Sequence, residues 1–285
     1  MIRSLAFIPS HKIDGFNLIA RKKPDAVCFD LEDSLPFEKK KYGLKKLKKF
    51  LSSHKKSKIK LFVRMEKINN SNKDFFNAIN NNIHSILIPK VSNTILIKKF
   101  ESELSQFEKK NKYKNKIYLS FLVESINGFY NLDSLIKKSK RVKYLIYGEE
   151  DFLADFEFYN YDYEPNLDFY KSKICFLAKE FNLQAIYTPY LKIKNLSGLK
   201  KHIKISKKFG FNGMLVVHPK QIGITNKEFM PTKKDYEISK KILLSQKSKK
   251  YEGQNISILR GNLIGPPMIK RALKVVKLYE YFKKN

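Results

Sequence analysis

The sequence predicts an α/β protein, a (β/α)8 or TIM barrel with extra C-terminal helices. Two observations support this fold: eight apolar runs of strand length lie between residues 4 and 219, and amphipathic, lysine-rich segments separate them. Strands and helices in regular alternation favour a parallel sheet, and eight such repeats fit closure into a barrel. The alternative is a doubly wound open sheet, but no G-x-G-x-x-G turn follows the first run.

The predicted strands are apolar almost throughout, as is typical of strands buried on both faces. They cover residues 4–9, 26–31, 59–65, 85–90, 117–124, 143–151, 183–189 and 213–219. Between them, apolar residues recur every three or four positions, which predicts helices. The predicted helices cover residues 40–55, 94–111, 128–139, 166–181 and 196–209.

The C-terminal part of the chain exceeds what a minimal barrel needs. It is predicted to be helical from about residue 233, and a final helix starts at the proline pair of "PPMIKRALKVVKLYEYFKK". We therefore divide the chain into a barrel domain, residues 1–230, and a C-terminal helical extension, residues 231–285. We expect the extension to pack on a neighbouring subunit or to cap the site.

The formal net charge of +31 comes almost entirely from lysine. Only six of the 58 basic residues are arginines, which leaves 52 lysines spread over nearly the whole length. Proteins that read nucleic acids favour arginine for bidentate contacts, so we interpret the charge as a solvated surface, and this argues against a nucleic-acid partner. A chain that drifts toward lysine keeps arginine mainly where a planar fork is needed.

The two cysteines, Cys28 and Cys175, are too few and too far apart for a disulfide framework or a zinc site. A reducing, cytoplasmic location fits this usage best. The apolar run from Leu5 to Pro9 is too short for a signal sequence, and no run approaches the length of a membrane span.

Charged side chains follow most of the predicted strands, and in a barrel these positions converge on one mouth. Glu124 and Asp151 end neighbouring strands. Two carboxylates there repel each other unless a cation lies between them, and an all-oxygen site suits Mg²⁺. The alternative is that both are solvated loop acids or pair with lysine. If Asp151 ends the sixth strand and points to the barrel axis, Glu149 points to the same face as Asp151 and Glu150 points the other way.

A series of motifs covers nearly the whole chain in order. It comprises "RSLAFIPS", "AVCFDLED", "FVRMEK", "ILIPKV", "FLVESINGFYNL", "IYGEEDFLADF", "FNGMLVVHPKQI", "ITNKEFMPT" and "ILRGNLIGPPMIKRA". Each motif alone is weak, but the ordered series resembles the citrate lyase β-subunit family, within the broader HpcH/HpaI aldolase group.

The resemblance implies a TIM barrel that forms a trimer or a hexamer. Such an enzyme uses Mg²⁺ to make or break a carbon–carbon bond, converting a 3-hydroxy-acyl thioester of CoA to or from a 2-oxo acid and an acyl thioester.

By matching position, the resemblance also assigns roles to particular residues. Glu124 and Asp151 would be the metal ligands, and Arg64 would hold the carboxylate and developing oxyanion of the 2-oxo acid. The other expected site residues are Glu32 and Asp33, which line the pocket beside Arg64, and Arg3 and Lys90, which lie near the negative charge of the substrate.

The sequence departs from the family pattern at several places around this site. The usual "FVPG" reads "FIPS" with Ser10, the usual asparagine of "VRVN" is Glu66, and Tyr187 replaces an aspartate. Gly265 in "LIGPPM" stands where malyl-type relatives carry an acid. Two alternatives therefore stay open: a CoA-independent aldolase that acts on a 2-oxo acid, and a non-catalytic barrel that binds a polyanion.

Overall fold

The computed structural model describes residues 1–54, 58–69, 71–158, 165–246, 256–259 and 261–284. Contacts between Cα atoms divide the chain into two compact units, Met1–Asn226 and Lys227–Asn285. The first unit contains the eight strands that the sequence predicts, and the second contains the last two long helices. Within the described ranges, no helix combines the length and the apolar content that crossing a bilayer requires.

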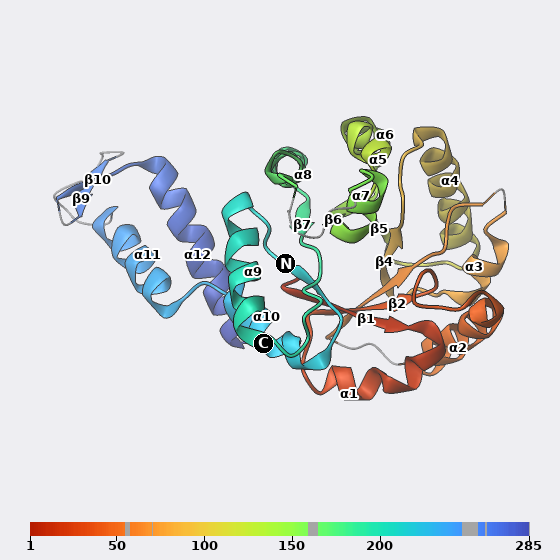
Figure 1. The fold of residues 1–285 in the computed structure, drawn as a ribbon. Helices are drawn as coiled ribbons and strands as arrows, with labels where there is room; N and C mark the ends of the chain where they lie inside the picture. The colour runs from red at the N-terminus through yellow and green to blue at the C-terminus, as the bar shows by residue number, and fades with distance from the viewer. Residues whose placement is uncertain (55–57, 70, 159–164, 247–255, 260, 285) are drawn as a thin grey trace. The chain divides into compact units, whose positions relative to one another are not determined.

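The first unit is built on one sheet of eight parallel strands in the order β7-β6-β5-β4-β3-β2-β1-β8 (Figure 1). The strands are β1 Ser4–Pro9, β2 Ala26–Asp30, β3 Lys60–Arg64, β4 Ile83–Ile88, β5 Tyr118–Val123, β6 Val142–Tyr147, β7 Gln184–Ile186 and β8 Met214–Val216. A parallel bridge between Tyr187 and Met214 brings β7 and β8 together, so the sheet curves into a barrel. The predicted fold class is confirmed.

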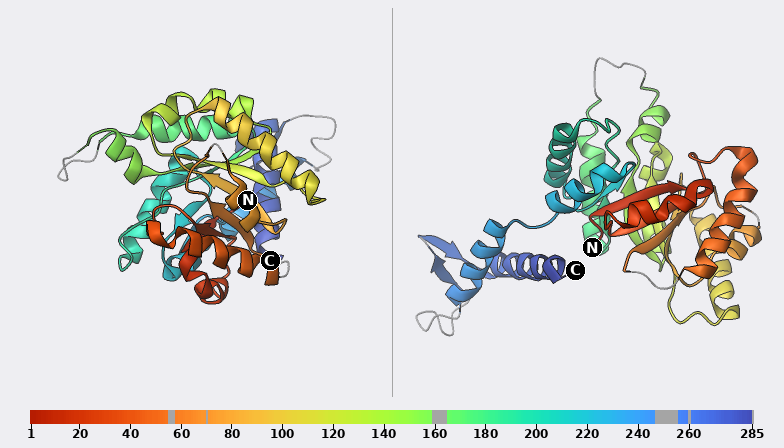
Figure 2. Two further views of the ribbon diagram at one scale, coloured as in Figure 1. Left: turned by 90° about the vertical axis from the view of Figure 1, so that its right-hand side faces the viewer. Right: turned by 90° about the horizontal axis from the view of Figure 1, so that it is seen from below.

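Helices surround the strands of this unit, as the views in Figure 2 show. They are η1 Ser10–Gly15, α1 Phe16–Ala20, η2 Phe37–Lys39, α2 Lys40–Ser53, α3 Lys73–Ala78, α4 Thr94–Lys110, α5 Ile126–Tyr130, α6 Leu132–Lys138, α7 Glu149–Asp155, α8 Asp168–Glu180, α9 Leu196–Phe209 and α10 Pro219–Glu228. Asn93 shows why α4 begins where it does: its side chain accepts hydrogen bonds from the N–H groups of Ile95 and Leu96, which have no partner within the helix.

Side chains from all eight strands fill the barrel interior. Leu5, Phe62, Leu122 and Ile146 belong to one buried cluster. On each strand, the side chains that alternate with those of the cluster point outward, toward the helices. A filled interior leaves no pore, so polar chemistry is confined to the strand ends.

The second unit is a helical pair with a small hairpin. Its elements are α11 Lys233–Gln246, β9 Ser257–Leu259, β10 Asn262–Ile264 and α12 Pro266–Lys284. α11 lies alongside α12, where the rings of Tyr236 and Tyr279 stack at 4.4 Å and the Tyr236 hydroxyl donates to Glu280. Residues 247–255, 260 and 285 of this unit lie outside the described residues.

Candidate active site

At the carboxyl ends of β2 and β3, an aspartate holds an arginine in place. Asp30 and Arg64 are paired in register at the last positions of these two strands. The Asp30 carboxylate accepts two hydrogen bonds from the guanidinium, 2.6 Å from Nε and 2.7 Å from Nη2. The ring of Phe7 lies below, 5.4 Å from the guanidinium carbon. This bidentate pair fixes the orientation of Arg64 at the mouth of the barrel.

The ion pair between Asp30 and Arg64 outweighs the cost of burying both charges. Burial by itself would raise the pKa of Asp30, but the hydrogen bonds and charge of Arg64 outweigh it and leave that pKa below its ordinary value. Burial likewise acts to lower the pKa of Arg64, yet Asp30 holds that pKa above its ordinary value. Both groups therefore stay charged.

Two more carboxylates follow Asp30 and approach the same guanidinium. Asp33 accepts a hydrogen bond from Nη1 at 3.0 Å. Glu32 Oε2 lies 2.9 Å from Nη1, but this buried oxygen has no hydrogen bond among the described residues. Burial raises the pKa of Glu32 to about 7, against the opposing effect of the Arg64 charge. Glu32 can therefore gain or lose a proton near neutral pH.

Glu124 follows β5 directly and is 3% exposed. Its Oε1 accepts a hydrogen bond of 2.8 Å from the backbone N–H of Lys90, which has φ of 46°. Gly148 makes room on the other side, because a Cβ there would lie 2.9 Å from the Glu124 Cβ. Burial, together with the charges of Glu32 and Asp151, raises the pKa of Glu124 to about 8.

The acidic cluster after β6 lies on a helix, and our assignment of residues 148–151 to a strand was wrong. β6 ends at Tyr147, and Glu149, Glu150 and Asp151 form the first turn of α7. Side chains on a helix do not alternate between two faces. Glu149 accordingly turns away to pair with Lys171 at 3.0 Å, while Asp151 Oδ1 lies 3.7 Å from Lys90 Nζ.

Lys90 provides positive charge to these acids. Burial acts to lower its pKa, but the charges of Asp151, Glu32 and Glu124 outweigh this and raise it. Its side chain is 58% exposed, so it can rotate away from Asp151. These contacts place Lys90 and Arg64 near one another with the four predicted acids of the mouth, which are Glu32, Asp33, Glu124 and Asp151.

Arg3 is not brought to this group. It precedes β1, at the amino end of the strand, and forms a bidentate pair with Asp25, with 2.8 Å from Nε and 2.7 Å from Nη2. Strand ends of opposite sense lie on opposite sides of a barrel. Our expectation that Arg3 lies near the substrate is therefore wrong, and the pair instead joins the amino ends of β1 and β2.

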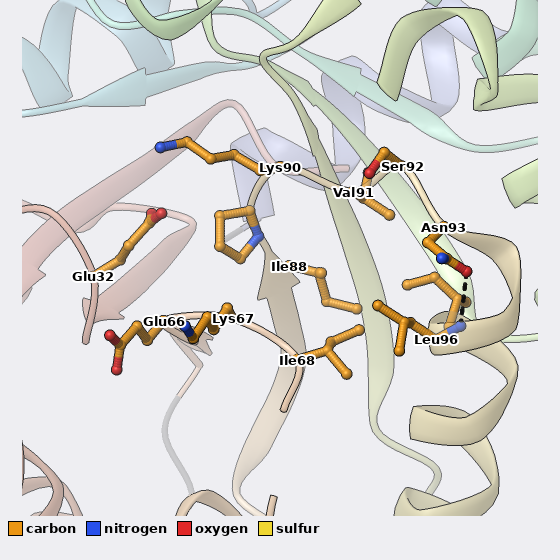
Figure 3. A pocket seen from close by; sticks show the side chains of 12 residues that line it. Glu32, Glu66, Lys67, Ile68, Ile88, Lys90, Val91, Ser92, Asn93 and Leu96 are labelled. Atoms are coloured by element: carbon orange, nitrogen blue, oxygen red, sulfur yellow. Dashed lines mark hydrogen bonds between the residues drawn. The ribbon is translucent and has the colours of Figure 1, made fainter. Parts of the chain in front are cut away.

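A cavity of about 320 Å³ opens beside these acids, and we call it the mouth cavity (Figure 3). Glu32 and Lys90 form one side of it, with the Glu32 carboxylate directed toward the Lys90 side chain. Ile68, Ile88 and Leu96 form an apolar wall opposite them. A small polar molecule bound there would contact the charged groups on one side and be shielded from water on the other.

The donor set fits Mg²⁺ with two protein ligands. Across the described part of the chain, no three His, Cys, Asp or Glu side chains are arranged as a metal site. Mg²⁺, however, is commonly held by one or two carboxylates, with waters and substrate oxygens at its other positions. Glu124 is buried beside the charge of Asp151 with a raised pKa, which is the situation that a divalent cation relieves.

Two features of the site escaped the sequence reasoning. The sequence reasoning gave no role to Asp30. An aspartate that ends a fully buried strand nevertheless needs a cationic partner, and the structure shows that this partner is Arg64. Glu66 forms an ion pair with Lys40, which lies at the start of α2. That pairing depends on how α2 packs, so no sequence signal identified it.

Comparisons with known proteins find relatives that match along almost the whole chain. Citrate lyase subunit beta of Haemophilus influenzae is 24% identical over 96% of this chain and 96% of its own length. The mitochondrial citramalyl-CoA lyase of Mus musculus is 23% identical over 97% of this chain and 85% of its own length. The structure of protein CitE from Mycobacterium tuberculosis in complex with magnesium, acetoacetate and coenzyme A is similar in fold, with a TM-score of 0.76, 17% identity and 97% coverage of both chains. The sequence model of the HpcH/HpaI aldolase/citrate lyase family matches residues 3–219, and the chain therefore belongs to that family.

Proposed function

We propose that this protein is a Mg²⁺-dependent carbon–carbon lyase that cleaves a 3-hydroxy-acyl thioester to a 2-oxo acid and an acyl thioester, or runs the reverse condensation. The observation that carries the proposal is the surplus of acidic groups at the mouth, where Glu124 and Glu32 are buried with raised pKa values. Family membership and the relatives that are lyases support the same reaction class.

Glu124 and Asp151 are the residues that would hold the metal. When bound, Mg²⁺ supplies Lewis-acid polarisation of the carbonyl oxygens of the substrate. Lys90 lies 3.7 Å from Asp151 and has an exposed side chain, so it can move to the negative end of the substrate when a cation takes its place.

Arg64 would bind the carboxylate of the 2-oxo acid. A guanidinium carries five N–H donors, and hydrogen bonds to Asp30 and Asp33 use three of them. The other two, one on each terminal nitrogen, suit a planar carboxylate. Asp30 and Asp33 act as positioning residues, because they hold this fork in one orientation.

Glu32 is the proposed proton-transfer residue, since it borders the mouth cavity and its pKa is about 7. In cleavage, its carboxylate takes the proton of the 3-hydroxyl group. The O–H electron pair becomes the new C=O bond of the 2-oxo acid, and the C2–C3 electron pair passes to the thioester enolate. The proton on Glu32 is then available to C2, which completes the acyl thioester.

We further propose that CoA carries the acyl group and that the chain assembles as a trimer or a hexamer. The support is the similarity to a citramalyl-CoA lyase and to a structure containing coenzyme A. Turnover of acyl-CoA but not of the free acid tests the first proposal and distinguishes it from a CoA-independent aldolase. The mass of the protein in solution tests the second.

Calorimetry of Mg²⁺ and a 2-oxo acid tests the proposed site. Wild type should bind pyruvate or oxaloacetate only when Mg²⁺ is present, and Asp151→Ala should lose this binding. Asp133→Ala is a matched control, because Asp133 also lies in the first turn of a helix and pairs with a lysine, but at the surface. No binding by wild type, or equal binding by Asp151→Ala, would contradict the proposal.

A further inference from the structure

A second cavity lies beside the mouth cavity and shares part of its wall. Its volume is about 390 Å³, and it is formed by the segments that follow β2 and β3; we call it the side cavity. Glu66 and Lys67 line both cavities. The proposed metal ligands Glu124 and Asp151 do not line the side cavity, and neither does Arg64. The side cavity can therefore take a part of the substrate that lies away from the metal.

The strand ends distribute their side chains between the two cavities. Glu32 lines the mouth cavity, whereas its neighbour Leu31 lines the side cavity. Met65, which follows Arg64, also lines the side cavity. Successive residues of an extended chain point in opposite directions. The segment after β2 therefore supplies an acid to the mouth cavity and an apolar side chain to the side cavity.

The side cavity is apolar in its depth. Leu31 and Met65 are buried, and Leu44 of α2 and Phe75 of α3 add to the same lining. An apolar cavity of about 150 Å³ is large enough for benzene, so this cavity has room for a phenyl ring or a short alkyl chain. It therefore favours a hydrophobic group.

The charges at the rim balance one another. Three acids and three lysines line the side cavity: Glu38, Glu66, Asp74, Lys40, Lys41 and Lys67. Glu66, which lines both cavities, forms an ion pair with Lys40, so the wall that the cavities share is locally neutral. A phosphate-rich group would need a surplus of positive charge, which this lining does not offer.

We propose that the substrate carries a hydrophobic substituent, of alkyl or phenyl size, that occupies the side cavity while the reacting carbons lie in the mouth cavity. The inference rests on the proposed lyase function for the location of the reacting carbons. The substituent belongs either to the 2-oxo acid or to the acyl half, and Leu31, Leu44, Met65 and Phe75 select for it.

Binding of two homologous series separates the two sources. The first series is pyruvate, 2-oxobutanoate and 2-oxohexanoate with Mg²⁺; the second is acetate, butanoate and hexanoate with Mg²⁺ and pyruvate. In one of them, affinity should rise about three- to fourfold with each added methylene. In Leu44→Trp, which fills the side cavity, this gain should disappear while affinity for pyruvate stays unchanged. Leu44→Phe, a smaller change, should reduce the gain in part.

A fluorescence reporter detects occupancy directly, because the chain contains no tryptophan. Phe37 lines the side cavity and is 82% exposed, so the emission of Phe37→Trp should shift to shorter wavelength when a six-carbon ligand binds. Ile95→Trp is the control: Ile95 is 75% exposed on α4, and its emission should not change.

The outcomes separate the two proposals. The side-cavity inference would be overturned, even if pyruvate binds, by either of two results. One is an affinity that does not rise with chain length in either series; the other is a rise with chain length that is as large in Leu44→Trp as in wild type. A shift of Phe37→Trp emission with hexanoate, without Mg²⁺-dependent binding of pyruvate, would support a hydrophobic site and contradict the proposed lyase function alone.

Discussion

Two buried arginines of the barrel unit, Arg141 and Arg64, differ in the number of carboxylates that they face. Arg141, 7% exposed, faces one carboxylate, Glu108, which accepts hydrogen bonds of 2.9 and 2.7 Å from its two terminal nitrogens. The carbonyl of Ile117 and the hydroxyl of Ser105 accept two more. Arg64, in contrast, faces Asp30, Glu32 and Asp33, with Glu124 close by.

The difference separates a structural ion pair from the proposed binding site. At Arg141 one positive charge meets one negative charge, and both terminal nitrogens and both carboxylate oxygens of the pair have hydrogen-bond partners. At Arg64 the acids outnumber the nearby cations, and burial of the surplus raises the pKa values of Glu32 and Glu124 to about 7 and about 8. Such a surplus costs stability unless a ligand supplies positive charge, so it indicates function.

The largest expected effect on stability is at the structural pair. Glu108→Ala leaves Arg141 buried without its carboxylate, and we expect a loss of about 3–5 kcal/mol in the free energy of unfolding. Urea denaturation measures it, with the exposed Asp133→Ala as the control, for which we expect at most about 1 kcal/mol. Binding of Mg²⁺ by the folded fraction should not change; a loss of metal binding would contradict the separation of the two regions.

The next effect is on activity at the other arginine. Arg64→Lys keeps the charge but loses the fork that Asp30 orients, so we expect the rate of thioester cleavage to fall about 100-fold or more. Steady-state kinetics with a 3-hydroxy-acyl-CoA measures it. A variant that keeps more than half of the wild-type rate would show that bidentate contact is unnecessary.

A pH-dependent effect follows from the surplus acids. The pKa of Glu124 is about 8 in the folded chain and about 4.3 when unfolded, so between pH 5 and pH 8 the native state holds a proton that the unfolded state has lost. Stability of the metal-free wild type should therefore fall as pH rises through this range. In Glu124→Gln the fall should be smaller by roughly 1–3 kcal/mol.

Urea unfolding of both proteins at several pH values between 5 and 8, with a chelator present, checks this difference. Parallel curves would mean that the carboxyl of Glu124 is ionised at neutral pH in the folded protein. A raised pKa of Glu124 in the folded protein would then be contradicted.

The smallest effect on stability is expected at Glu66, which lines both cavities. Glu66→Gln removes the charge opposite Lys40, and both side chains are partly exposed, so stability should change by less than about 1 kcal/mol. Thermal unfolding measures it. A loss of several kcal/mol would mean that the ion pair holds the loop after β3 in place.

Much of the barrel could be predicted because its strands are buried on both faces. The run "AVCFD" of β2 is buried at every position, and such a run leaves few alternatives once helices flank it. The prediction failed after Tyr147, where we continued the strand through Gly148 into three acids. Acids in succession suit the first turn of a helix, where they interact favourably with its dipole, and α7 begins there.

The site could be predicted only as far as strand ends define it. Asp30, Arg64 and Glu124 lie at carboxyl ends, and the order of the strands brings them together. Arg3 stands before its strand, and counting from the start of "SLAFIP" would have placed it at the amino end. The burial of Glu124 depends on the backbone of Lys90 and on the space at Gly148, and both are properties of packing that no single-sequence pattern contains.

We propose above all that the surplus acids at the mouth hold one divalent cation together with a 2-oxo acid. Electron paramagnetic resonance of Mn²⁺, which prefers the same oxygen ligands as Mg²⁺, counts the bound ions directly. With pyruvate present, wild type and Asp133→Asn should each bind one Mn²⁺ per chain, and Asp151→Asn should bind far more weakly. Failure of wild type to bind Mn²⁺, or equal binding by Asp151→Asn, would contradict the claim.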